Sequence, residues 1–71
     1  MTQWMRVRSS ILVSVRYDDE NRVLGIEFTD GSVYEYVEVP AEVHISLMKA
    51  ASLGAYYNGH IKGSYAFRRV R

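Results

Sequence analysis

The sequence contains no cysteine, so the chain can form neither a disulfide nor a thiolate metal site. Secreted domains of about this length, 71 residues, usually depend on such cross-links. A chain this short buries only about 60% of its surface on folding, so its core is thin. With 48% hydrophobic residues it nevertheless has the composition of a folded protein. We therefore expect a single domain that works in the reducing cytoplasm.

Long hydrophobic runs are also missing. No apolar stretch approaches the roughly 18 residues of a membrane-spanning helix. The opening residues, Met1 to Arg6, lack the apolar segment of a signal peptide. The sequence predicts neither a membrane span nor secretion.

Acidic residues are absent from both ends of the chain. All eight lie between Asp18 and Glu42, where Arg22 is the only opposing charge. Residues 1–17 hold three arginines and residues 43–71 hold five basic residues. If the two ends meet in the fold, the molecule has one basic and one acidic side, and a basic face is typical of nucleic-acid binders. The alternative is that the basic ends are merely solvated.

Alternation of apolar and polar residues predicts strands over residues 9–17, 23–28 and 33–38. The residues expected on the buried face of the first strand are Ile11, Val13, Val15 and Tyr17. Asp30-Gly31 predicts a hairpin with a type I′ turn, in which both central residues need positive φ. The three segments are expected to form an antiparallel meander.

After the meander, apolar residues recur at the spacing of a helix. Pro40 ends the sheet and begins a helix expected to run to about Ala51. Ser52 is expected to cap a second, short helix that Gly59 or Gly63 stops. The tail is predicted to be an extended segment or a short strand near the first strand. The fold class is therefore α+β.

No set of residues indicates catalysis. The two histidines, His44 and His60, are isolated, and no serine lies in a nucleophile motif. The histidines do not make a metal site and the glycines do not form a phosphate loop. An enzyme or small-ligand binder would need a deep apolar pocket. The residues that would have to meet in it are Ser10, Tyr56, Asn58 and His60.

Aromatic and basic residues indicate binding instead. Tyr34 and Tyr36 share one strand face, where they either stack on bases or pack against a helix. The segment 54–62 follows a helix start, whose N–H groups attract anions. Its Lys62 and the arginines of the tail carry positive charge that can neutralise phosphates.

Five groups of residues resemble the KTSC domain over residues 9–70, leaving residues 1–8 as an N-terminal segment. They are Ser9-Ser10 with Tyr17; Leu24, Ile26 and Phe28 with Gly31; Tyr34, Tyr36, Val39 and Pro40; Leu47, Ala50, Ser52, Gly54, Tyr56, Asn58 and Ile61; and Tyr65, Arg68 and Arg69. Ser10-Ile11 departs from the family, which often has an Asn or another polar residue between the serine and the apolar position. The resemblance implies a small domain that stands alone or ends some lysyl-tRNA synthetases, and a candidate nucleic-acid binder.

The sequence thus predicts a non-catalytic nucleic-acid-binding module, with RNA slightly favoured over DNA and no cofactor or metal. The predicted binding residues are Arg16, Tyr36, Tyr57, Asn58, Lys62, Arg68 and Arg69. One alternative is a protein-interaction or self-association module, such as a homodimer, that uses exposed sheet edges. The second is a small-ligand-binding protein or enzyme.

Overall fold

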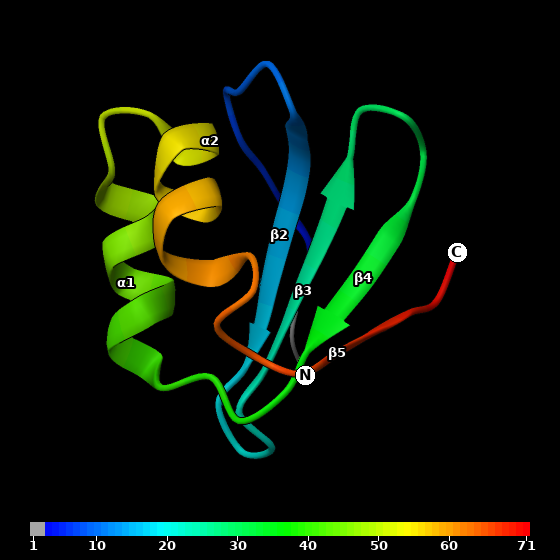
Figure 1. Ribbon diagram of the computed structural model, residues 1–71, viewed down its shortest axis with the longest axis vertical. Coiled ribbons are helices and arrows are strands. Elements are labelled where there is room, and N and C mark those ends of the chain that lie inside the picture. The colour runs from blue at the N-terminus through cyan, green and yellow to red at the C-terminus, as the bar shows by residue number, and fades with distance from the viewer. Residues whose placement is uncertain (1–2) are drawn as a thin grey trace.

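The computed structural model describes residues 3–71 and shows an α+β fold. One antiparallel sheet has the strand order β1-β2-β3-β4-β5, and the helices lie on one of its faces (Figure 1). The elements are β1 (Met5–Arg6), β2 (Leu12–Asp18), β3 (Val23–Phe28), β4 (Val33–Tyr36), α1 (Ala41–Lys49), α2 (Leu53–Tyr56), the π-helical turn η1 (Tyr57–Ile61) and β5 (Phe67–Arg69). The predicted meander, the two helices and the short final strand are confirmed. The described part of the chain contains no helix long and apolar enough to cross a membrane.

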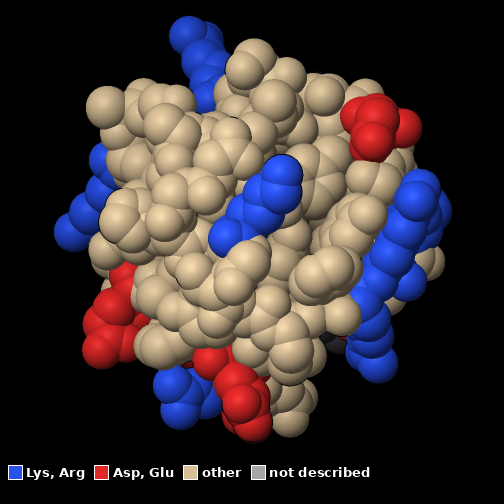
Figure 2. Space-filling view, in the orientation of Figure 1, with Lys and Arg blue, Asp and Glu red and all other residues tan. Residues whose placement is uncertain are grey.

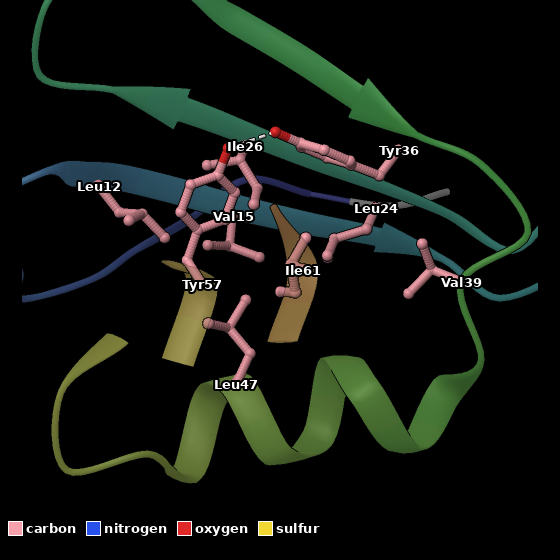
Figure 3. Close-up of a cluster of buried hydrophobic side chains, with 9 residues drawn as sticks. All are labelled: Leu12, Val15, Leu24, Ile26, Tyr36, Val39, Leu47, Tyr57 and Ile61. Carbon is pink, nitrogen blue, oxygen red and sulfur yellow. Dashed lines mark hydrogen bonds between the residues drawn. The ribbon is translucent and has the colours of Figure 1, made fainter. Parts of the chain in front are cut away.

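The core lies between the sheet and the helices (Figure 3). The sheet supplies most of it, and Leu47 is the buried residue of α1. The buried hydrophobic cluster comprises Leu12, Val15, Leu24, Ile26, Tyr36, Val39, Leu47, Tyr57 and Ile61.

A β-bulge changes which residues of β2 face this core. Leu12 pairs with Phe28 and Ser14 with Glu27, so one extra residue lies between them. Leu12 is consequently buried, and Val13 lines a groove on the opposite face of the sheet. The prediction that Val13 shares a buried face with Val15 is wrong, because strict alternation cannot anticipate the bulge.

The hairpin between β3 and β4 also differs from the prediction. Gly31 has a φ of 92°, but Asp30 does not have positive φ, so the turn is not type I′. The Gly31 N–H donates to the Phe28 carbonyl and the Phe28 N–H to the Ser32 carbonyl, both at 2.9 Å. This is a three-residue loop with a left-handed glycine. The Asp30 carboxylate accepts bonds from the N–H and hydroxyl of Ser32.

Both helices begin as predicted, the first ends earlier than predicted, and the second ends just before Gly63, one of the two glycines predicted to stop it. Ser52 caps α2 by accepting a hydrogen bond from the Ala55 N–H at 3.1 Å. Helix α1 ends at Lys49 rather than Ala51, because Ala50 adopts an extended conformation. The second helix passes through Gly59 and continues to Ile61 as the π-helical turn.

Both ends of the described chain join the sheet. Met5 and Arg6 pair with Val15 and Ser14, so the N-terminal segment 1–8 contributes an edge strand, although residues 1–2 lie outside the described part. Strand β5 pairs with β4 at the opposite edge. The prediction that the tail lies near the first strand, 9–17, is wrong, because β3 and β4 lie between them.

Candidate nucleic-acid interface

The two faces of the sheet divide the predicted binding residues. The helices cover the face that carries Leu24, Ile26 and Tyr36, whereas Arg16 and Arg68 lie on the other, which we call the open face. Tyr36, Tyr57, Asn58 and Lys62 all line one pocket on the helix side. Arg69 alternates with Arg68 along β5 and therefore stands on the helix side too.

On the open face, two of the predicted cations share one carboxylate. Strand register aligns Arg16, Gly25, Glu35 and Arg68 in a row across β2 to β5. Arg68 donates to Glu35 at 2.7 and 2.9 Å, and Arg16 donates to it at 3.0 Å. Glu35 is only 9% exposed. These hydrogen bonds, above all those from Arg68, hold the pKa of Glu35 below its ordinary value.

Gly25 makes room for this arrangement. A Cβ atom at Gly25 would lie 3.1 Å from both the Arg16 side chain and the Trp4 ring. The Arg16 guanidinium also lies 5.1 Å from the centroid of the Trp4 ring. On the open face, Arg16 therefore packs between Trp4 and Glu35, whereas the Arg68 side chain remains 72% exposed.

The predicted separation into a basic and an acidic side is wrong. The acidic strands β3 and β4 lie between the basic ends, so charges pair instead of separating. Arg71 forms an ion pair with Glu27 at 3.1 Å, in addition to the two ion pairs of Glu35. On the face seen in Figure 2, acidic and basic side chains are interspersed around the rim.

The pocket on the helix side has a volume of about 560 Å³ and lies between β4, β5 and η1. Five of its eleven lining residues are aromatic, and we call it the aromatic pocket. The rings that line it are Phe28, Tyr34, Tyr36, Tyr57 and Phe67. The Phe67 centroid lies 5.4 Å from that of Tyr34 and 5.5 Å from that of Tyr36, so the rings are continuous.

Tyr36 and Tyr57 form the buried part of the aromatic pocket. They are 3% and 7% exposed, and their hydroxyls share a hydrogen bond of 2.5 Å (Figure 3). Burial, and then this bond, raise the pKa of Tyr36, so its phenol stays protonated. Because the rings are enclosed, the prediction that they offer stacking faces to bases does not fit the structure. Phe67, which is 56% exposed, offers such a face.

The π-helical turn places the polar rim of the pocket. The Lys62 N–H donates to the Tyr57 carbonyl five residues earlier at 2.9 Å, which widens the turn. Tyr57 and Ile61 are both directed into the core, while Asn58 and Lys62 are exposed and line the pocket. Such single π turns are frequent at functional sites.

Lys62 lines the pocket. Arg69 does not line it, but its guanidinium lies 6.0 Å from the centroid of the Tyr34 ring and donates to the Arg71 carbonyl at 3.2 Å. Within residues 3–71 neither side chain forms an ion pair. Asp30 also lines the pocket, where its bonds with Ser32 lower its pKa.

Other predicted features do not assemble into a site. Of Ser10, Tyr56, Asn58 and His60, only Asn58 lines the aromatic pocket. Tyr56 and His60 stack on each other, with their ring centroids 4.4 Å apart. The Ala55 N–H of α2 is already engaged by Ser52. The predicted site does not include Phe67. Successive residues of a strand point to opposite faces, so its position next to Arg68 in a short strand indicates that the two side chains lie on opposite faces.

The fold and pocket define the chain as a small single-sheet α+β domain with an aromatic pocket. The family model of the KTSC domain matches residues 8–65, so the chain belongs to the KTSC domain family. The crystal structure of a KTSC domain protein from Yersinia pestis has 37% sequence identity and a TM-score of 0.97, and it covers 100% of both chains. The recognition made from the sequence is confirmed.

Relatives carry a similar sequence in two contexts, as most of a small protein and as a small part of a large enzyme. An uncharacterized protein of Stutzerimonas stutzeri is 44% identical over 90% of this chain and 92% of its own length. A lysine–tRNA ligase of Nostoc punctiforme is 36% identical over 93% of this chain. The chain spans only 12% of that ligase, which is a much larger protein.

Proposed function

We propose that this KTSC domain is a small, non-catalytic nucleic-acid-binding module, with RNA slightly favoured over DNA, that binds through the aromatic pocket. The observation that carries the proposal is the convergence of an exposed aromatic ring, Phe67, with Lys62 and Arg69. An aromatic face stacks on bases and neighbouring cations attract the phosphates between them. The similar segment in a lysine–tRNA ligase supports RNA, because tRNA is named as a substrate of that enzyme.

The cations of the proposed interface are fewer than the sequence predicted. Arg16 and Arg68 both bond to Glu35, whose one negative charge offsets one of their two positive charges, and they lie on the open face. Lys62 and Arg69 are the predicted cations on the side of the aromatic pocket. Two contacts to single-stranded nucleic acid give a slope of about −1.4 in log affinity against log salt, which is about a sevenfold loss between roughly 50 and 200 mM salt.

Fluorescence anisotropy tests the proposal. Labelled single-stranded RNA, single-stranded DNA and duplex DNA are titrated at both salt concentrations. We expect Lys62→Glu to weaken binding of the best ligand about tenfold and to lower the salt slope. The matched control is Lys49→Glu, which makes the same charge change at an exposed site on α1 that does not line the pocket.

Two results would contradict the proposal. One is the absence of binding to all three ligands at low salt. The other is an equal loss with Lys62→Glu and Lys49→Glu, which would indicate attraction by net charge rather than by this pocket.

Self-association through sheet edges is the rival function. The exposed Phe67 on the edge strand β5 favours it. Against it, the two edge strands span only 2 and 3 residues, and short edges resist pairing with another chain. Size-exclusion chromatography with light scattering separates the two functions: a stable dimer that Phe67→Ala dissociates would favour the rival.

A further inference from the structure

We infer that the aromatic pocket binds a single unpaired nucleotide, with its base against Phe67 and its one phosphate at Lys62 and Arg69. This inference rests on the proposed function and specifies its ligand. The shared chemistry is one base with one phosphate, whether in a free nucleotide or within a single strand.

Stacking on the exposed side of Phe67 favours an unpaired base over one inside a duplex. One part of the Phe67 ring packs near Tyr34 and Tyr36, and its 56% exposed surface faces outward. A base inside a duplex has its faces covered by its neighbours, so it has to leave the stack before it can lie on this ring. Stacking on an aromatic ring also tolerates all four bases, because each has a π face.

The hydroxyl pair of Tyr36 and Tyr57 provides a hydrogen-bond donor inside this apolar wall. The two phenols have two protons, and their mutual bond uses one. Neither hydroxyl has another hydrogen-bond partner within residues 3–71, so the second proton is available to the edge of a base. Every base has a carbonyl oxygen or a ring nitrogen that accepts such a bond. This contact therefore anchors a base without fixing its identity.

The charges at the rim limit the number of phosphates. Lys62 lines the pocket and Arg69 lies beside Tyr34, so both attract an anion. The carboxylate of Asp30, however, lines the same pocket and already interacts with Arg69. Asp30 stays ionised because its bonds with Ser32 lower its pKa. A nucleotide with one phosphate satisfies both cations, whereas additional phosphates would meet this negative charge.

The experiment is a titration of the ¹⁵N-labelled chain followed by amide chemical shifts. The ligands are uridine, uridine 5′-monophosphate, uridine 5′-triphosphate, adenosine 5′-monophosphate, the RNA tetramer of uridine, and a blunt RNA duplex. We expect the monophosphate to bind about fivefold more tightly than uridine and no less tightly than the triphosphate. The two monophosphates should agree within about threefold, and the shifts should gather at Asn58, Lys62 and Phe67.

Matched variants identify the contact. Phe67→Ala should weaken binding of the monophosphate about tenfold. The control Ile45→Ala removes a 50% exposed side chain on α1 and should change nothing. A tetramer that binds more tightly than the free nucleotide indicates that the ligand lies within a strand, and the reverse indicates a free nucleotide; either supports the inference.

Failure of the inference differs from failure of the proposed function. If the duplex shifts the pocket residues as strongly as the tetramer, or if uridine and its monophosphate bind equally, the inference is wrong and nucleic-acid binding stands. If neither single-stranded nor duplex ligands bind, both are wrong.

Discussion

The two faces of one sheet use their charged residues in opposite ways. On the open face, Arg16 and Arg68 pair with Glu35 and Arg71 pairs with Glu27, whereas Arg6, which lines the groove beside Trp4, has no ion pair within residues 3–71. On the helix side, Lys62 and Arg69 stand beside aromatic rings, and neither has an ion pair within the described residues. The first arrangement consolidates the sheet, and the second leaves charge available to a ligand.

This difference shows that the number of basic residues in the sequence does not tell how many of them are available on one binding surface. The tail contributes Arg68 and Arg69 as neighbours in the sequence, yet strand alternation sends them to opposite faces. Charge reversal at Arg68 would place a second carboxylate beside Glu35 and disturb the fold. Reversal at Arg69 is therefore the informative variant for binding.

The largest expected effect on stability concerns the helix side of the sheet. Leu47 is 0% exposed and is the buried residue of α1, so Leu47→Ala leaves a cavity between helix and sheet. We expect a loss of about 3 kcal/mol in the free energy of unfolding, measured by urea denaturation. Ile45→Ala, on the exposed side of the same helix, should cost less than about 0.5 kcal/mol. Equal losses would show that α1 does not pack through Leu47.

The second effect concerns the open face. Glu35→Gln removes the charge that Arg16 and Arg68 share while preserving the shape of the side chain. We expect a loss of about 1.5 kcal/mol, because both arginines keep partial access to water. Glu38→Gln, at an exposed carboxylate without an ion pair in the described chain, is the control. A loss no larger than that of the control would mean that the network does not stabilise the sheet.

The pH dependence of the same variant sharpens this test. The pKa of Glu35 is held below its ordinary value of 4.5 in the folded chain. Its stabilising contribution is therefore complete above pH 4.5 and disappears as the pH falls toward the folded pKa. The unfolding free energies of the wild type and Glu35→Gln should converge on acidification below pH 4.5. A difference that stays constant down to complete protonation would exclude the ionised carboxylate as its source.

The smallest expected effect on stability concerns the buried part of the aromatic pocket. Tyr36→Phe removes one hydroxyl and leaves that of Tyr57 without its partner, which should cost about 1 kcal/mol in thermal or urea unfolding. Tyr65→Phe is the matched control, because that hydroxyl makes no hydrogen bond within residues 3–71. A neutral Tyr36→Phe variant would show that the hydroxyl pair contributes nothing to stability.

Much of the fold followed from local patterns. Alternation located β3 and β4, and Pro40 and Ser52 located the helix starts, because these signals act over a few residues. The bulge in β2 and the pairing of β1 were not predictable in this way. The first interrupts the alternation, and the second involves only 2 residues whose pairing depends on β2.

The site was predictable only in part, because it depends on register. Lys62 and Asn58 were predicted, and they do meet at one pocket with Tyr36 and Tyr57. The shared ion pairs of Arg16 and Arg68 with Glu35 depend on the alignment of four strands, and the exposure of Phe67 depends on β5 pairing with β4. The sequence shows these residues, but it does not show which residues they contact in the fold.

The most direct test of the central claim compares one exposed aromatic residue from each face. Single-stranded RNA is titrated by anisotropy with Phe67→Ala and with Trp4→Ala, whose rings are 56% and 40% exposed. We predict that Phe67→Ala weakens binding about tenfold, the loss expected for one stacked base, and that Trp4→Ala binds like the wild type. Loss of binding in Trp4→Ala with full binding in Phe67→Ala would place the interface on the open face and contradict the account.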